Sequence, residues 1–297
     1  MPTPEKKTRA DLAQTRTGTL SNRVSMMSVG ALEHALLKKY PAEDAQDWDR
    51  TGLLVGDPAA IVSNVAVCLD PTVKAIEEAR GLGANVLITH HPVYLDAPTI
   101  FMPSDSPLQS SGCGVWAAIE NKVALMCFHT ALDVSQDGAK LLPGMLRLKF
   151  EGIVDPIDES GKKGYGQLCS LSSQDKGMSL GQLAARCTSV FSRHPRVWGD
   201  FNRSLSRIVT CTGSSGDLVK KCIAAHVDVL VAGEVRYHDA LDASQAGLAI
   251  IDLGHDTSEL PLLAALVASV EDTGIASERI TIIEQNNNWS SPESIRV

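Results

Sequence analysis

Histidines follow apolar runs at three points of the chain, in positions where they could bind a metal ion. His90 and His91 come directly after an apolar run in the segment LITHHPVY, and His129 and His255 follow two other apolar runs. In α/β proteins, ligands gather where parallel strands end, so these positions predict a common site. Histidines scattered through a core would not show this placement.

The adjacent pair His90 and His91 sets a geometric condition on that site. Neighbouring side chains on an extended strand point to opposite faces of the sheet. Both rings therefore reach one site only if the chain bends, or if each ring binds a different metal ion. Pro92 fixes the backbone just after the pair. A surface pair or a buried hydrogen-bonded pair is the structural alternative to metal ligation.

Two carboxylates stand four residues after a histidine. His129 and Asp133 in FHTALD share one face if a helical turn forms, and a carboxylate beside imidazoles suits zinc, iron or manganese. His255 and Glu259 in DLGHDTSEL repeat the spacing, and a carboxylate commonly bridges the ions of a paired-metal site. Capping of a helix by Asp133 and a favourable helix dipole for Glu259 are the alternatives.

Taken together, these segments predict a dinuclear metal centre that activates water. Five ligands are too many for one structural zinc ion, which takes four. They fit two divalent ions, zinc, iron or manganese, that share a carboxylate and keep positions open for water. The predicted ligands are His90, His91, Asp133, His255 and Glu259.

Three further motifs are less specific. GEVRYHDA contains Glu234 and His238, and His238 is a candidate proton shuttle or orienting residue, or else a histidine on a helix surface. TGSSGD follows an apolar run and could hold a phosphate at a helix start, although a plain turn is the simpler interpretation. WDRTGLLVGD is a distinctive loop in which Gly52 and Gly56 suggest a constrained backbone.

The elements that must position these side chains alternate between strand and helix. Short apolar runs predict buried parallel strands, at 65–69, 86–89, 123–128, 207–212, 229–232, 249–253 and 280–284. Asp70 is the expected cap of the helix after the first run, and Thr257 or Ser258 that of the helix after the 249–253 run. VAVCLDPTVKAIEEARGLGANVLITHH and IVTCTGSSGDLVKKCIAAHVDVLVAGEVRYH share a pattern, which predicts two related α/β units.

The expected domain organisation follows from composition. We expect a disordered tail at 1–24, which is rich in Thr, Lys, Arg and Ser. A first α/β domain is expected at 25–155 and a second α/β unit at 165–297, whose C-terminal part is a candidate to pack back on the first. The Gly/Lys/Ser-rich stretch near Asp155–Gly166 marks the border between them.

Bulk properties exclude several classes of protein. The net charge of -8, without a dense run of Lys and Arg, argues against nucleic acid as a partner. No segment has the roughly 20 apolar residues of a membrane helix, and the polar N-terminus lacks the apolar stretch of a secretory signal. The seven cysteines form no Cys-x-x-Cys pair, so we expect reduced core residues in a cytoplasmic protein.

The motifs WDRTGLLVGD, ITHHP, HTALD, GEVRYHDA and GHDTSE resemble, in this order, those of the NGG-one-interacting-factor-three-like family, whose members are also called GTP cyclohydrolase 1 type 2 homologues. The resemblance spans Trp48 to Glu259. It implies two linked, related α/β domains with mixed sheets, a dinuclear metal site in the cleft between them, and a toroidal homohexamer. The implied ligands are the five residues named above, with Glu259 as the bridge and His129 beside the site. Asp256 departs from the family, which often has an aromatic residue there.

The resemblance implies a hydrolase that acts on a small molecule, in the cyclohydrolase version a nucleotide. Water then attacks C8 of a guanine ring, formate is released, and His129 or His238 donates or accepts protons. Phosphoester or amide hydrolysis by the same two ions is an alternative. A metal-binding or regulatory scaffold without catalysis is another.

Overall fold

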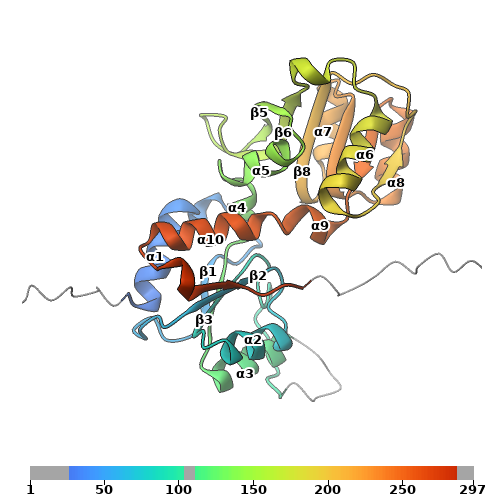
Figure 1. Cartoon of the computed structure of the whole chain (residues 1–297). Coiled ribbons are helices and arrows are strands. Elements are labelled where there is room, and N and C mark those ends of the chain that lie inside the picture. Colours follow the sequence, from blue (N-terminus) through green and yellow to red (C-terminus); the bar gives the residue numbers. More distant parts are fainter. Residues whose placement is uncertain (1–26, 104–110, 286–297) are drawn as a thin grey trace, which may run out of the picture.

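The fold is described from a computed structural model, which defines residues 27–103 and 111–285. The tail expected at 1–24 lies outside the described residues. Figure 1 shows the arrangement of the elements. The helices and strands are α1 (Val29–Lys39), β1 (Gly52–Val55), β2 (Val65–Cys68), α2 (Val73–Gly81), β3 (Val86–Thr89), α3 (Ser111–Asn121), β4 (Ala124–Cys127), α4 (Thr130–Asp133), α5 (Gly138–Met145), β5 (Lys149–Pro156), β6 (Gly164–Ser170), α6 (Leu180–Phe191), β7 (Arg196–Trp198), β8 (Arg207–Ser214), α7 (Leu218–Ala224), β9 (Val229–Glu234), α8 (Tyr237–Gln245), β10 (Ala249–Asp252), α9 (His255–Glu259), α10 (Leu262–Asp272) and β11 (Ile280–Ile282).

The first unit is built on a five-stranded sheet in the order β1-β4-β3-β2-β11. Strands β4, β3, β2 and β11 are parallel, and β1 runs antiparallel to β4. Every residue of β2, β3 and β4 is buried, because helices cover both faces of the sheet. Helices α1 and α10 pack on one face through Leu36 and Leu266, and α2 and α3 pack on the other through Ile76 and Ala118.

The second unit is built on a six-stranded sheet in the order β5-β6-β8-β9-β10-β7. Strands β8, β9 and β10 are parallel, and β5, β6 and β7 pair antiparallel. Helix α6 packs on one face through Leu183, while α7 and α8 pack on the other through Leu218 and Ala240. Both β2–α2–β3 and β8–α7–β9 are parallel strand–helix–strand segments. The prediction of two related α/β units with mixed sheets is confirmed.

The chain crosses between the two units twice. It enters the second unit after α5, because β5 already pairs with β6 in the second sheet. The stretch near Asp155–Gly166 therefore contains the loop of the β5–β6 hairpin, and the crossing comes before Lys149, earlier than the border expected from composition. The chain returns through α9 and α10, and β11 pairs in parallel with β2.

The two crossings bring α4 and α9 to the place where the units meet (Figure 1). Strands β3, β4 and β10 all end close to these helices, so residues after each strand can share one site. Within the described part of the chain, no helix has both the length and the apolar character that crossing a bilayer requires. The seven cysteines are free and buried, as expected for reduced core residues.

Candidate metal centre

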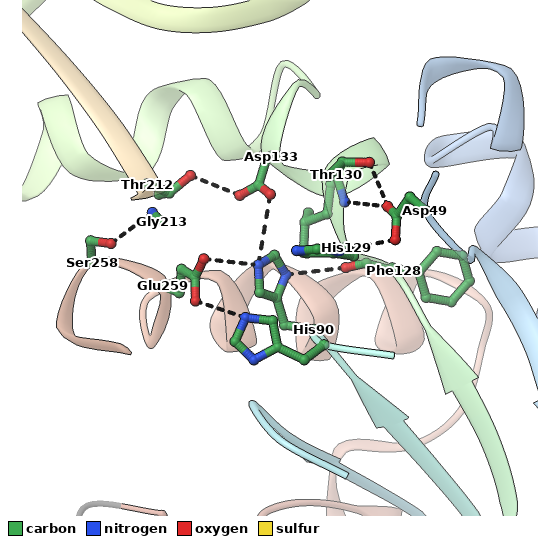
Figure 2. Close-up of polar contacts among 12 residues, drawn as sticks. Asp49, His90, Phe128, His129, Thr130, Asp133, Thr212, Gly213, Ser258 and Glu259 are labelled. Carbon is green, nitrogen blue, oxygen red and sulfur yellow. Dashed lines mark hydrogen bonds and ion pairs between the residues drawn. The ribbon is translucent and has the colours of Figure 1, made fainter. Parts of the chain in front are cut away.

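The buried carboxylate of Glu259 is the focus of the site (Figure 2). Its Oε1 lies 3.1 Å from Nε2 of His255 and 3.5 Å from Nε2 of His90, and its Oε2 lies 3.1 Å from Nε2 of His91. Glu259 belongs to α9, next to the second sheet, whereas His90 and His91 follow β3 of the first sheet. Imidazoles from both units therefore converge on one carboxylate.

Asp133 completes the set of five predicted ligands. Its Oδ2 lies 3.7 Å from Nε2 of His90, and its Oδ1 accepts a 2.7 Å hydrogen bond from the Thr212 hydroxyl at the end of β8. Asp133 is the last residue of the short helix α4, so it does not cap the start of that helix. The structure brings all five predicted ligands together.

A bend after β3 allows the adjacent histidines to reach one site. The Thr89 hydroxyl donates a 2.6 Å hydrogen bond to the carbonyl of His91, which turns the chain directly after the strand. The rings of His90 and His91 then lie with centroids 5.1 Å apart and planes tilted by 49°. The chain therefore bends after the strand, as the sequence requires if both rings are to reach one site.

In His90, His91 and His255, the ring nitrogen that faces away from Glu259 is Nδ1, and it donates a hydrogen bond to an acceptor outside the cluster. Nδ1 of His90 donates to the Phe128 carbonyl at 3.2 Å. Nδ1 of His91 donates to Asp70 at 2.8 Å. Nδ1 of His255 donates to Glu234 at 3.1 Å. Acceptors at Nδ1 fix the tautomer in which Nε2 is free to bind a cation, and metal-ligating histidines almost always have such a partner.

Two buried polar atoms at the centre of the cluster have no hydrogen-bond partner among the described residues. They are Nε2 of His90 and Oε2 of Glu259. An unpaired buried polar atom is costly, and a metal ion between these residues would satisfy both. The ligand atoms of His91, His255 and Glu259 lie within 4.8 Å of one another, and so do those of His90, His91 and His129. The cluster therefore could bind metal.

The charges of the cluster agree with this conclusion. Burial alone would raise the pKa of Glu259, but the surrounding imidazoles hold it well below its usual range. The hydrogen bond with Glu259 raises the pKa of His255 to about 9. Burial lowers the pKa of His91, but the carboxylates of Asp70 and Glu259, which lie beside its two ring nitrogens, outweigh burial and raise that pKa to about 10. The site thus favours positive charge beside Glu259, and a divalent cation supplies such charge.

The cluster opens into a cavity of about 760 Å³ between the two units. Trp48, His129 and Tyr165 lie on its wall, together with the segment Gly213–Asp217 from the TGSSGD motif. A second cavity, of about 380 Å³, also touches His91 and His255. Cavities of this size suit small-molecule ligands.

The two predicted proton-transfer histidines differ in position. His129 lines the larger cavity, and its ring lies 5.1 Å from that of His90. His238 is exposed on α8, its ring contacts Tyr237, and it is not among the residues around either of these two cavities. The prediction for His238 therefore lacks geometric support, because its helical face turns it to solvent.

Asp256, where the family often has an aromatic residue, does not join the cluster. Its Oδ2 accepts a 2.8 Å hydrogen bond from Arg193, and it lines the smaller cavity. Sequence reasoning missed two acceptors that matter more to the site, Asp49 and Asp70. Both hold a histidine of the site through Nδ1.

The fold and the site define a two-unit α/β protein with a histidine–carboxylate centre between the units. The family described as Duf34/NIF3 (NGG1p interacting factor 3) matches residues 27–288, and the chain belongs to this family.

Curated relatives carry the name GTP cyclohydrolase 1 type 2 homolog. The Streptomyces coelicolor protein is 33% identical over 231 residues, which cover 76% of this chain and 80% of that protein. The Clostridium perfringens protein is 27% identical over 233 residues, which cover 78% of this chain and 87% of that protein.

Solved structures show the same fold. A Staphylococcus aureus hypothetical protein, SA1388, superposes with a TM-score of 0.79 at 24% identity, covering 90% of this chain and 99% of that chain. A Bacillus cereus protein related to NIF3 superposes with a TM-score of 0.77 at 19% identity, covering 88% of this chain and 98% of that chain.

Proposed function

We propose that this protein is a hydrolase that uses two divalent metal ions to activate water. The observation that carries the proposal is the convergence of three imidazole Nε2 atoms on the buried carboxylate of Glu259. Bound divalent ions would lower the pKa of a bound water and would hold a substrate oxygen by their positive charge. The proposed ligands are His90, His91, Asp133, His255 and Glu259.

The position of each ligand supports a division into two ion sites. His90 faces Asp133 and Oε1 of Glu259, while His91 faces Oε2 of Glu259. His255 reaches Glu259 from the opposite unit. In the proposal, Glu259 bridges the two ions. This mixture of imidazole and carboxylate suits zinc, iron or manganese.

Residues around the cluster would bind the substrate and move protons. His129 lies on the cavity wall beside His90 and is the proposed proton acceptor or donor. Trp48, which is 54% exposed, offers an aromatic surface beside it. In the version that the relatives' printed name suggests, the substrate would be GTP. Two waters would add in turn at C8 of guanine, the bonds from C8 to N9 and N7 would break with protons going to both nitrogens, and C8 would leave as formate.

One observation favours a second candidate, hydrolysis of a less highly charged ester or amide. The only Lys or Arg around the larger cavity in the described chain is Lys221, and it forms an ion pair with Asp155. Asp217 adds another negative charge to the same wall. A nucleoside triphosphate normally meets several cationic partners, so this wall suits a substrate with fewer negative charges.

The experiment is elemental analysis after anaerobic purification, combined with assays of GTP and of a generic phosphodiester. We expect two ions per chain, and either formate from GTP or ester cleavage. The Glu259→Gln variant should stay folded and lose at least one ion, because an amide cannot bridge two cations as a carboxylate does. Glu271→Gln, the same change at an exposed position on α10, is the matched control and should retain both ions.

Two outcomes would contradict the proposal. Retention of both ions by Glu259→Gln would remove the bridging role. Absence of turnover, with metal content that follows the growth medium, would favour a metal-binding scaffold.

The proposal also includes a homohexamer, as the family resemblance implies. It further includes a cytoplasmic location, since seven free buried thiols suit a reducing compartment.

A further inference from the structure

Asp49 lies in the WDRTG segment, and its carboxylate is surrounded by donors. Its Oδ1 accepts hydrogen bonds from the Arg50 backbone N–H at 2.7 Å and from Nδ1 of His129 at 2.9 Å. Its Oδ2 accepts from the Thr130 backbone N–H at 2.9 Å and from the Thr130 hydroxyl. The side chain of Asp49 is fully buried. A buried carboxylate with this many donors is held in one orientation.

These hydrogen bonds determine which nitrogen of His129 faces the cavity. Because Nδ1 carries the proton donated to Asp49, the unprotonated nitrogen is Nε2. Figure 2 shows the ring of His129 reaching from Asp49 towards His90. The arrangement is that of a carboxylate–imidazole pair, in which the acid fixes the tautomer and the orientation of the base.

His129 differs from the other three histidines of the cluster. His90, His91 and His255 each bring Nε2 within 3.5 Å of Glu259. Among the described ion pairs, His129 meets only Asp49. A ring nitrogen of His129 lies within 4.8 Å of ring nitrogens of His90 and His91. His129 therefore faces the centre without a described ion pair to Asp133 or Glu259, and in the proposal it serves as a proton acceptor.

The loop that carries Asp49 is anchored through Gln46. The backbone N–H of Gln46 donates to the Thr130 hydroxyl at 3.0 Å, and its side-chain amide donates to the Tyr165 hydroxyl of the second unit at 3.2 Å. Trp48 lies edge-on to the ring of His129, with centroids 5.7 Å apart. One short loop thus supplies both the hydrogen bond to Nδ1 of His129 and an aromatic contact to its ring.

We propose that Asp49 is a positioning residue, which holds His129 in the tautomer and orientation that present Nε2 as a proton acceptor in the cavity beside the metal centre. This proposal rests on the proposed hydrolytic function. In the same loop, Trp48 lies on the cavity wall and Asp49 is buried.

The test measures the tautomer of His129 by nitrogen-15 NMR of the zinc-loaded, histidine-labelled full chain. We expect Nε2 to be unprotonated in the parent protein. Asp49→Asn should raise the population protonated at Nε2 and should leave the zinc content unchanged. Thr130→Val is the matched control: it removes the hydroxyl bonds to the same carboxylate and to the Gln46 N–H, leaves the bond to His129, and should not change the tautomer.

A substrate found in the hydrolysis assays provides a second readout. Asp49→Asn should lower kcat on the order of 10²–10⁴-fold with little change in KM, as expected for loss of a general base, whereas Thr130→Val should retain most of kcat. Absence of any turnover would count against the hydrolase proposal and leave the tautomer result standing.

Three results would overturn the positioning role. The first is a parent protein in which His129 carries its proton on Nε2, a measurement that does not depend on any variant folding. The second is loss of a zinc ion in Asp49→Asn but not in Thr130→Val, which would make His129 a metal ligand. The third is the same tautomer change in both variants.

Discussion

Two glycines make room for Glu259 at the end of β8 and β9. Gly213 has φ +57°, and a Cβ on it would collide with Oε1 of Glu259. A Cβ on Gly233 would collide with the Ser258 hydroxyl, which accepts a 2.9 Å hydrogen bond from the Gly213 N–H and donates one to the His255 carbonyl. The approach of α9 to these strands therefore depends on the absence of side chains.

The Gly213→Ala variant should weaken metal binding more than its backbone strain accounts for. The new methyl group displaces the carboxylate of Glu259, so zinc affinity should fall at least tenfold in a competition titration. Gly216→Ala is the control, because Gly216 also has positive φ (+47°) but open space around its Cβ. Each variant should lose about 1 kcal/mol of unfolding free energy from the left-handed backbone. Equal zinc affinity in the two variants would contradict the argument.

At the scale of single residues, the proposed metal ligands were predictable from the sequence, whereas the residues that accept hydrogen bonds from their Nδ1 atoms were not. Imidazoles and carboxylates after apolar runs are visible in the sequence, which is why His90 and Glu259 could be named. Asp70 was expected to cap a helix, but the cap is Thr72, whose hydroxyl accepts from the Ala75 N–H. Asp70 instead holds His91, which is 21 residues away. Such a partner depends on tertiary packing, and no local pattern reports it.

At the scale of elements, the end of the described chain supports a ligand of the site. Oε1 of Gln285 accepts hydrogen bonds from the backbone N–H groups of Leu69 and Asp70, at 3.1 and 2.8 Å. Its Nε2 donates to the Asp70 carbonyl at 2.9 Å. Because Asp70 holds His91, Gln285, three residues after β11, helps to fix the position of a proposed ligand.

Buried parallel strands were predictable from the sequence, whereas several partly exposed strands were not. The strand expected at 280–284 exists as β11, but it is half-buried or exposed at all its positions, not buried as expected. Strands β2, β3 and β4 are buried at every position, so they show as continuous apolar runs. Strand β5 is exposed or half-buried throughout, and its sequence, KFEGIVDP, has no such run. The crossing between the units was consequently expected too late in the chain. The expected caps Thr257 and Ser258 also lie inside α9, whose N-cap is Gly254.

Asp228 connects the loop before β8 to the start of β9, and this connection should depend on pH. Its Oδ2 accepts from the backbone N–H groups of Ser206 and Arg207, and its Oδ1 accepts from Arg203. Burial would raise the pKa of Asp228, but these hydrogen bonds outweigh burial and lower it. A carboxyl group whose pKa is lower in the folded state stabilises the fold above its unfolded pKa, and this contribution is lost as pH falls through the folded value.

The Asp228→Asn variant should therefore unfold about 1–2 kcal/mol more easily than the parent at pH 7. The difference should shrink as pH falls below about 4, the ordinary Asp value. Urea denaturation at several pH values measures it. Asp217→Asn is the control, since Asp217 pairs with Lys220 at the surface, where ion pairs contribute little. A difference that is constant with pH would contradict the electrostatic origin.

At the scale of the whole molecule, the proposed centre joins the two units. The described hydrogen bonds across it include Thr212 to Asp133 and Gln46 to Tyr165. Five ligands from both units also lie within one chain, so a single copy contains a complete proposed centre. Cations bound there would add further links between the units. This arrangement separates metal binding from assembly, and the two can be tested independently.

The proposed hexamer should have six times the 31.7 kDa mass of the chain in multi-angle light scattering at micromolar concentration. In the proposed assembly, contacts between copies cover some of the large apolar side chains that are exposed on a single copy, such as Ile119 at 65% and Tyr237 at 61%. Removal of metal with a chelator should leave this mass unchanged, because no proposed ligand is shared between copies. A 31.7 kDa particle before chelation would contradict the hexamer. Dissociation on chelation alone would show that the cations also link copies.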